Sequence, residues 1–448
     1  MSTRPVPPNS LMRPETAADD PARAMLSLSP SKPDLVVFVN GFPRLSETFV
    51  LNELLELERR GYGLHVIALR RPEETVKLEA LARLRARVEY LPDLVAVSQR
   101  LSVRVAHGAL LLRRRSAYLD GMARALASPD ATKPALAQAA VLAHRLLRLG
   151  APPVYLHFAH KPATYGRLAA LLAGVPYALS AHAKDIWLTP EPELEAKVRH
   201  AQVVLTCTTE GHERLADLAG GRTPVRLVYH GVETGFALPQ RRPGRTIRVL
   251  AIGRLVEKKG YETLIEAAAL LAEAAVPFTL RIVGEGPEWP RLQRLVRERG
   301  LHAHVHFLGP MTEPEVHAEL TAADVFALGC RQLANGDRDG IPNVIVEAMA
   351  YGLPVVSTRL AGVAEAVVDG ECGLLAAPED PAGLAEALRR LVADEALRVR
   401  FGAAARQRAV ERFDRAANVP HVVEALVGAG ILRQPSESGS VVAMRSAA

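Results

Sequence analysis

The chain has 448 residues, 49% of them hydrophobic, which is too long for one core and predicts two globular domains of about 200 residues each. Its net charge of +6 fits a small anionic ligand or an anionic membrane surface as well as nucleic acid, so charge alone selects no partner. Three widely separated cysteines, Cys207, Cys330 and Cys372, argue against a disulfide scaffold.

The two ends of the chain predict disorder rather than structure. Residues 1–32 and 434–448 are rich in polar residues and lack the apolar surface that would offset the entropy of ordering. We expect no signal peptide, because the first 30 residues contain no continuous apolar core, and no apolar run elsewhere reaches the roughly 20 residues of a membrane span. These features favour a cytoplasmic protein.

Between the ends, short β-branched runs alternate with helical patterns. The first block, 33–238, contains predicted strands at 35–41, 64–69, 153–159, 176–182, 202–208 and 225–231, and a basic linker follows at 239–246. The second block, 247–410, contains predicted strands at 247–254, 278–286, 305–309, 325–329 and 354–358, followed by a helix at 411–433 that can pack back on the first block. This alternation predicts two α/β domains of the Rossmann-like, doubly wound kind, with a ligand cleft between them.

A basic loop follows the first strand of the second block. Arg254 comes directly after that strand, and Lys258 and Lys259 directly precede Gly260, where a helix begins. Cations between a strand's carboxyl end and a helix's amino end suit a phosphate ligand. A solvated basic loop is the alternative.

The stretch GDRDGIPNVIVEAMAYGLPVVST, residues 336–358, predicts a second helix start at the cleft. Gly340 and Ile341 lead into Pro342, which suits the first helical position, so free backbone N–H groups near Asn343 and Val344 can hold a diphosphate. Glu347, one and a half turns later, can accept two hydrogen bonds from a ribose diol. The alternative for Glu347 is an ordinary acid near a helix amino end.

Two glycines in IVGEGPEW, residues 282–289, form a weaker signal. Trp289 occupies the position of a third glycine, which argues against a dinucleotide loop. We interpret Gly284 and Gly286 as a tight turn that lets a ligand approach closely, with bare turn geometry as the alternative.

Together, GDRDGIPNVIVEAMAYGLPVV, GRLVEKKG and VGEGPEWPRL resemble the retaining glycosyltransferases of family 4, which have the two-domain GT-B fold. The runs GFPRLSETFVLNEL (41–54) and SAHAKDIW (180–187) are similar to the branch that makes colanic acid and other exopolysaccharides. The resemblance spans residues 35–425. It implies a hexosyltransferase that uses a UDP- or GDP-linked sugar and needs no cofactor.

The resemblance also implies a role for each matching residue. Arg254 and Lys259 match the pair that holds the donor diphosphate, and Glu347 matches the acid that binds the ribose. Asp339 matches the acid that contacts the donor sugar, where the family has Glu, so the carboxylate here is one methylene shorter. His182 matches a cleft histidine near the sugar. Gly41 matches a glycine loop near the diphosphate and the acceptor.

Metal use is not expected. Fixed cations and a helix amino end can stabilise the leaving diphosphate without a metal ion. The run DRD, residues 337–339, has the spelling of a metal-binding pair but lies at the donor-sugar loop of this fold. Retention is then expected to proceed by front-face attack, with no covalent nucleophile.

The acceptor side is described by two sequence features. Arg44, Ser46, Glu47 and Thr48 lie on a predicted cleft loop, although the last three also fit a helix cap. Residues 99–115 mix Leu and Val with arginines, which suits either an anionic membrane surface, at the cytoplasmic face of the inner membrane, or a solvated helix face. We expect a glycan or polyprenyl-linked saccharide as the acceptor and no nucleic acid.

Two other functional classes stay open. A catalytically silent GT-B protein that only binds nucleotide sugars is expected to lose Arg254, Lys259 or Glu347, and none is lost. A different GT-B enzyme, such as a nucleotide-sugar epimerase or a phosphorylase, is the other alternative, although no pyridoxal-bearing lysine region is recognisable for a phosphorylase.

Overall fold

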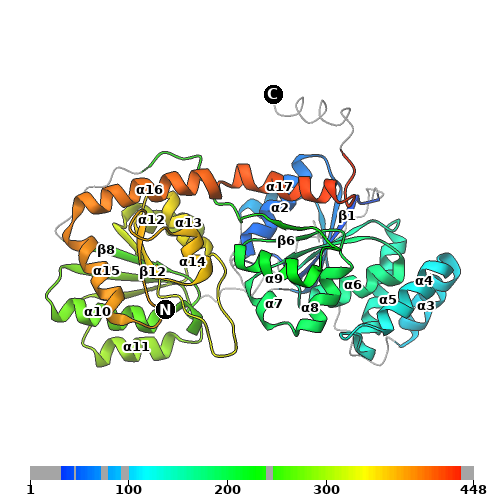
Figure 1. Ribbon diagram of the computed structural model, residues 1–448, viewed down its shortest axis with the longest axis horizontal. Coiled ribbons are helices and arrows are strands. Elements are labelled where there is room, and N and C mark those ends of the chain that lie inside the picture. The colour runs from blue at the N-terminus through cyan, green and yellow to red at the C-terminus, as the bar shows by residue number, and fades with distance from the viewer. Residues whose placement is uncertain (1–31, 45–46, 72–78, 92–99, 239–245, 435–448) are drawn as a thin grey trace, which may run out of the picture.

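The computed structural model describes residues 32–44, 47–71, 79–91, 100–238 and 246–434. It contains two α/β domains side by side, spanned along one edge by a pair of long helices (Figure 1). The predicted disorder of 1–31 and 435–448, most of the predicted linker, and Ser46 lie outside the described residues. No helix in the described part of the chain is long and apolar enough to cross a bilayer.

The first domain is built on a parallel sheet with the strand order β3-β2-β1-β4-β5-β6-β7. Its strands are β1 (Leu35–Gly41), β2 (Leu64–Arg70), β3 (Arg87–Tyr90), β4 (Val154–His157), β5 (Tyr177–Ala181), β6 (Val204–Thr206) and β7 (Val225–Leu227). Its helices are α2 (Thr48–Arg59), the 3₁₀ helix η2 (Glu79–Arg83), α3 (Arg100–Arg113), α4 (Arg115–Leu126), α5 (Lys133–Arg148), α6 (Lys161–Ala173), α7 (Ala183–Leu188), α8 (Glu191–Arg199) and α9 (Thr209–Ala219).

The second domain is built on a parallel sheet with the order β10-β9-β8-β11-β12-β13. Its strands are β8 (Ile247–Ile252), β9 (Phe278–Val283), β10 (Val305–Gly309), β11 (Val325–Ala327), β12 (Val355–Thr358) and β13 (Gly373–Ala376). Its helices are η4 (Glu257–Lys259, 3₁₀), α10 (Tyr261–Glu273), α11 (Trp289–Glu298), α12 (Glu313–Ala322), α13 (Asn343–Ala350), α14 (Ala361–Ala366), α15 (Pro381–Ala393) and α16 (Glu395–Phe413). The predicted fold class is confirmed.

Both sheets are buried on two faces, which explains their continuous apolar strands. β1 contributes Leu35, Val37 and Val39 to one face and Val36 and Phe38 to the other, and all five are buried. In each sheet the strand order reverses beside the first strand, between β1 and β4 and between β8 and β11. Ligands of such sheets bind at the carboxyl ends of the strands beside this reversal.

The last helix, α17 (Arg415–Gly428), returns the chain to the first domain. Val422, Val423 and Leu426 of α17 are buried in the same core as β1 and α2 of the first domain. The crossing helix begins at Arg415, four residues later than predicted, because α16 continues to Phe413 and Asp414 caps α17 by accepting the Ala417 N–H. Helices α16 and α17 therefore link the two domains, both through the chain and through the packing of α17 on the first domain (Figure 1).

Candidate active site

A cluster of charges lies at the carboxyl end of β8, where the sequence predicts a phosphate site. Asp339 forms ion pairs with Lys259 at 2.7 Å and with Lys258 at 3.2 Å, and Lys258 also contacts Asp337 at 3.1 Å. The structure thus brings the loop that follows β8 and the loop that precedes α13 into direct contact. Sequence reasoning identified Asp339 and Lys259 but gave Lys258 no separate role.

These ion pairs decide the protonation of the cluster. Burial alone would raise the pKa of Asp339, but the ammonium groups of Lys259 and Lys258 outweigh burial and hold that pKa below its usual value. Burial opposes the charge on Lys259 as well, yet the Asp339 carboxylate outweighs it and raises the pKa of Lys259. The acid is therefore ionised and the amine charged at neutral pH.

Arg254 is the exposed cation of this site. Its side chain has no hydrogen-bond or ion-pair partner within the described ranges, and its charge acts on neighbouring Lys259. An unpaired guanidinium beside a half-buried lysine can bind an anion without first breaking a protein contact. This arrangement suits an anionic ligand that enters from the cleft.

Glycines fix the backbone of these loops. A Cβ on Gly260 would lie 1.6 Å from the Gly329 carbonyl oxygen, so the turn before α10 directly contacts the loop that follows β11. A Cβ on Gly284 would meet the Gly253 carbonyl oxygen at 2.1 Å, and one on Gly286 would meet that of Leu255 at 2.4 Å. The nearest neighbour of Gly284 and Gly286 is thus the protein's own loop 253–255, and close packing of that loop explains both glycines.

The start of α13 faces the same cluster. The helix begins at Asn343, with Pro342 as its N-cap rather than its first residue, because the ψ of Pro342 is extended at 118°. The backbone N–H groups of Asn343 and Val344 make no hydrogen bond to another described residue. Gly340 and half-buried Ile341 carry the chain into this helix from the acidic loop.

Glu347 lies on the first turns of α13, as the sequence predicts. Its carboxylate is half-buried and has no hydrogen-bond partner in the described part of the chain. Burial, together with the nearby charge of Glu313, raises the pKa of Glu347 to about 7. A carboxylate with no protein partner can accept hydrogen bonds from a ligand, such as those of a hydroxyl pair.

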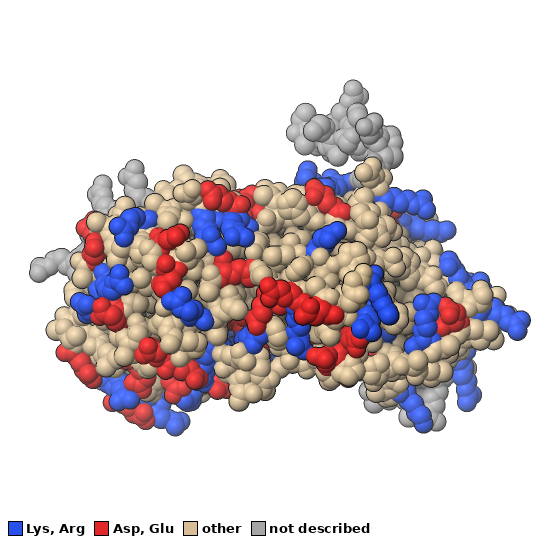
Figure 2. All heavy atoms as spheres, viewed as in Figure 1, with Lys and Arg blue, Asp and Glu red and all other residues tan. Residues whose placement is uncertain are grey.

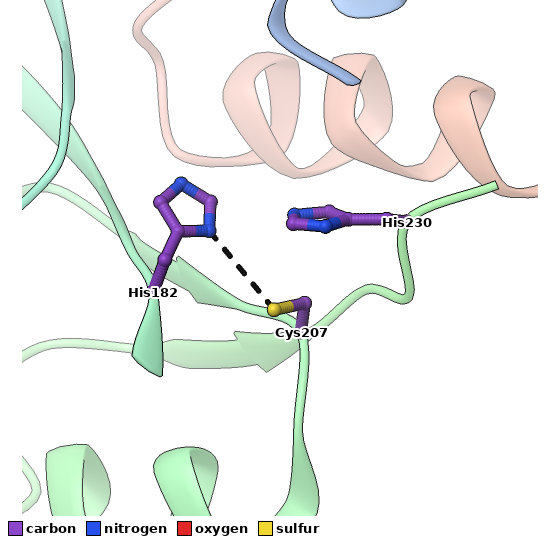
Figure 3. A group of neighbouring side chains, drawn as sticks. All are labelled: His182, Cys207 and His230. Atoms are coloured by element: carbon purple, nitrogen blue, oxygen red, sulfur yellow. Dashed lines mark hydrogen bonds between the residues drawn. The ribbon is translucent and has the colours of Figure 1, made fainter. Parts of the chain in front are cut away.

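The facing edge of the first domain carries a cluster of neutral histidines. Four neighbouring strands, β4 to β7, end at or shortly before His157, His182, Cys207 and His230. The Nδ1 atom of His182 lies 4.0 Å from the Cys207 sulfur, and the His230 ring faces the same thiol (Figure 3). Of this cluster, sequence reasoning identified only His182. The sequence does contain a signal for the other residues, because each lies near the carboxyl end of a predicted strand. In a parallel sheet these carboxyl ends lie along one edge, so the residues that follow them are neighbours.

Burial keeps these rings uncharged. It lowers the pKa of His157 to about 3 and that of His230 to about 4, and burial with the other two rings lowers the pKa of His182 well below its usual value. His182 Nε2 lies 3.2 Å from Ser180 Oγ, and Phe49 stacks on His230 with ring centroids 3.9 Å apart. Neutral imidazoles can donate and accept hydrogen bonds at once, which suits sugar hydroxyl groups.

Within the described residues, one group of histidine, cysteine and acid side chains has a spacing that could hold a metal ion: His182, Cys207 and His230. The possible ligand atoms of these three residues lie within 4.8 Å of one another. Two imidazoles and a thiol are ligand types for zinc. Burial raises the pKa of Cys207 to about 12, so the free thiol holds its proton, and binding of a zinc ion here would have to release that proton.

The predicted acceptor loop borders this histidine cluster. Arg44 pairs with Glu47 at 2.6 Å, and α2 begins at Thr48, next to Phe49. Glu47 is the N-cap of α2 without a side-chain cap bond, so the helix-cap interpretation gains no support from Glu47. Gly41 ends β1, and a Cβ there would meet Arg44 and Arg70 at 3.6 Å.

Sequence relatives agree with this two-domain site. The family model for "Glycosyl transferases group 1" matches residues 239–408. The chain is 30% identical over 375 residues to a putative colanic acid biosynthesis glycosyltransferase, WcaL, of Escherichia coli K12, covering 78% of this chain and 88% of that protein. It is 28% identical to the amylovoran biosynthesis glycosyltransferase AmsK of Erwinia amylovora, covering 85% and 96%.

Solved structures share the fold at low identity. HepE of Anabaena, determined in complex with UDP-glucose, has a TM-score of 0.64 at 19% identity, covering 88% of this chain and 99% of that one. Sucrose-phosphate synthase of Thermosynechococcus elongatus has a TM-score of 0.65 at 18% identity, covering 88% and 98%. With the family match, the full-length relatives and the two facing sheets in agreement, the chain belongs to the group 1 glycosyltransferases of GT-B fold.

Proposed function

We propose that this glycosyltransferase moves a sugar, with retention and without a metal ion, from a UDP- or GDP-linked donor to a glycan or lipid-linked saccharide in exopolysaccharide biosynthesis. The observation that carries the proposal is the charge cluster of Arg254, Lys258, Lys259 and Asp339 beside the free N–H groups of α13. The names of two relatives, a putative colanic acid biosynthesis glycosyltransferase and an amylovoran biosynthesis glycosyltransferase, support the exopolysaccharide context.

The donor diphosphate is expected to bind at Arg254, Lys259 and the amino end of α13. As the bond from the sugar to the diphosphate breaks, negative charge grows on the leaving phosphate and positive charge on the sugar. Fixed cations and N–H dipoles stabilise the phosphate without reorganising. We expect the ionised Asp339 to interact with the sugar and Glu347 to bind the two hydroxyls of the ribose.

Metal independence draws support from the chemistry of the acidic loop. Asp337 and Asp339 share the ammonium group of Lys258, at 3.1 Å and 3.2 Å. A lysine thus supplies positive charge between two carboxylates, at a place where a divalent ion could otherwise bind. The expected absence of a cofactor remains part of the proposal.

The acceptor is proposed to be presented at an anionic membrane surface. On α3, Leu101 and Leu112 are 70% and 88% exposed, and Arg104 is exposed on the same helix, while exposed Arg115 begins α4 directly after it. Figure 2 shows Lys and Arg side chains projecting from the end of the molecule that α3 and α4 form. Exposed leucines can enter the interface while arginines pair with anionic headgroups, each worth about 1 kcal/mol.

Membrane contact is tested by sedimentation with vesicles that contain or lack anionic phospholipid. Leu112→Asn should reduce binding to anionic vesicles, because it removes an exposed apolar side chain from α3. Val399→Asn is the matched control, because Val399 is 67% exposed on α16 of the other domain. Equal binding of both variants and the wild type would refute the surface.

The donor is tested by a thermal-shift screen of nucleotide sugars. A ligand that binds only the folded state stabilises it by about 2.7 kcal/mol at one hundred times its Kd, so the true donor or its nucleoside diphosphate should raise Tm clearly. No shift with any UDP- or GDP-linked sugar would contradict the proposal. A shift without any turnover would favour the silent sugar-binding alternative.

A further inference from the structure

One side chain of the loop at residues 337–339 reaches across the cleft to the first domain. Arg338, between Asp337 and Asp339, donates a hydrogen bond to Glu210 of the first domain at 2.6 Å. Its guanidinium carbon also lies 3.7 Å from the centroid of the Trp187 ring, again in the first domain. The Arg338 side chain is only 13% exposed, although its partner Glu210 is 40% exposed, so the guanidinium itself is largely shielded from water.

The partners of Arg338 lie on the elements that carry the histidine cluster. Trp187 is on α7, which begins directly after His182, and Glu210 is on α9, which begins two residues after Cys207. Arg338 is also held within its own domain, because it donates to Gln332 at 2.7 Å. One guanidinium therefore links the loop of Asp339 to the two elements that follow the cleft residues His182 and Cys207.

The backbone beside Arg338 makes the same crossing. A Cβ on Gly340 would lie 3.1 Å from the Thr208 methyl and 3.6 Å from Ala183 Cβ, so this glycine packs directly against the first domain. On its other side, a Cβ on Gly362 would meet the Gly340 carbonyl oxygen at 2.3 Å. The loop that carries Asp339 thus packs between the two domains. A small change in the angle between the domains would therefore move Asp339 relative to His182.

A second crossing reinforces the first. Glu365 of α14 accepts hydrogen bonds from the Thr209 N–H at 2.9 Å and from the Tyr229 hydroxyl at 2.6 Å. Tyr229 directly precedes His230, so this contact also ends beside the histidine cluster. Unlike Arg338, Glu365 does not lie on the loop of Asp339, which makes Arg338 the contact that acts on the acid itself.

We propose that Arg338 is a positioning residue that couples closure of the two domains to the placement of Asp339 over the donor sugar. The inference rests on the proposed function, because it assigns Asp339 to the sugar. A shielded cation stacked on an indole and paired with a carboxylate is strong only when the domains are closed. Arg338 thereby holds the reacting geometry in the closed form and has no partner across the cleft in an open one.

Kinetics of Arg338→Ala and of a matched control test the coupling. Arg214 also lies over the Trp187 ring, at 5.1 Å, but it belongs to α9 and its ion pair with Glu191 stays within the first domain. Arg338→Ala should lower kcat about 10- to 100-fold, since misplacing a reacting group by about 1 Å costs this much, and should change the Kd of UDP or GDP less than threefold. Arg214→Ala should leave both near wild type.

A double-mutant cycle separates this contact from general destabilisation. If Trp187 and Arg338 act through one contact, Trp187→Ala and the double variant should lose no more kcat than Arg338→Ala alone. Trp187→Phe, which keeps an aromatic face, should restore most of the rate. Additive losses, wild-type kcat in Arg338→Ala, or an equal loss in Arg214→Ala would overturn the proposal.

Solution scattering tests the same coupling without any donor. In ligand-free protein, Arg338→Ala should populate a more open arrangement and show a larger radius of gyration than the wild type and Arg214→Ala. Identical scattering curves for all three proteins would overturn the coupling, whether or not a donor has been found. Turnover by no protein, with an opened Arg338→Ala, would instead locate the failure in the proposed function.

Discussion

Glu347 offers a prediction in which the structure sets both a magnitude and a pH range. Its carboxylate is half-buried, and burial raises its pKa to about 7. We propose that the ionised form accepts two hydrogen bonds from the ribose of the donor. Glu347→Gln keeps the size of the side chain and removes the charge. At pH 8 this change should weaken nucleoside diphosphate binding by about 1.5–3 kcal/mol, the range for hydrogen bonds to a charged group.

The pH dependence follows from the same pKa. If only the ionised form binds the diol, affinity is complete well above pH 7 and declines as the carboxylate takes up a proton below pH 7. With a pKa of about 7, roughly one tenth of the sites are ionised at pH 6, so the wild-type Kd should be about tenfold weaker at pH 6 than at pH 8.

Calorimetry at pH 6, 7 and 8 measures this dependence for the wild type and Glu347→Gln. The terminal phosphate of a nucleoside diphosphate also titrates near pH 6, and Glu347→Gln retains that contribution, so the difference between the two proteins isolates the carboxylate. A Kd with the same pH dependence in both proteins, or wild-type affinity in Glu347→Gln, would refute the assignment of the ribose to Glu347.

Four further outcomes are expected at the same site. Arg254→Ala should cost about 2–4 kcal/mol in kcat/KM, measured by steady-state kinetics, with Tm unchanged because the side chain has no partner in the described chain. Asp339→Asn should leave nucleoside diphosphate affinity by calorimetry nearly intact while turnover falls sharply, and the reverse pattern would exchange the two acidic roles. Activity should survive EDTA; loss that magnesium restores would implicate residues 337–339, and loss that zinc restores would implicate the His182 group. Because burial lowers the pKa of His157 to about 3, the unfolded chain binds this proton first as pH falls. The contribution of the neutral His157 to the free energy of unfolding should be fully present above about pH 6.5. Below pH 6.5 the free energy of unfolding should decrease by up to about 1.4 kcal/mol per pH unit, and urea unfolding should show a smaller decrease in His157→Phe.

The strands that the sequence predicts are those with strong apolar runs. β1 and β5 lie within predicted stretches because both of their faces are buried, so their sequences are mostly apolar. Two edge strands were missed. β3 has the sequence RVEY and is half-exposed, and β13 is four residues long and starts at a glycine, so neither stands out from a loop.

The candidate site also has some features that a short stretch of sequence predicts and others that depend on contacts between distant residues. Lys259 before a helix and Glu347 inside one are local features, and the sequence predicts their places at the cleft. What surrounds them depends on residues far apart in the chain: Asp339 is held by two lysines about 80 residues away, and Arg338 reaches Glu210 in the other domain. The raised pKa of Glu347 likewise comes from burial, which no short motif encodes.

Glycines illustrate this limit clearly. The sequence shows that Gly284 and Gly286 permit a close approach, but it does not show what approaches. In the structure the carbonyl oxygens of Gly253 and Leu255 occupy that space, so loop packing accounts for both glycines. Close backbone contact between loops at neighbouring strand ends is a property of the folded sheet.

The central claim is that the cleft cleaves a nucleotide sugar by means of these residues. The most direct measurement is the rate of nucleoside diphosphate release from the stabilising donor, with an acceptor extract present, for the wild type, Arg254→Ala and Asp339→Asn. We predict steady release by the wild type and release reduced at least about thirtyfold by each variant, corresponding to about 2 kcal/mol or more. Equal release by all three proteins would contradict the account.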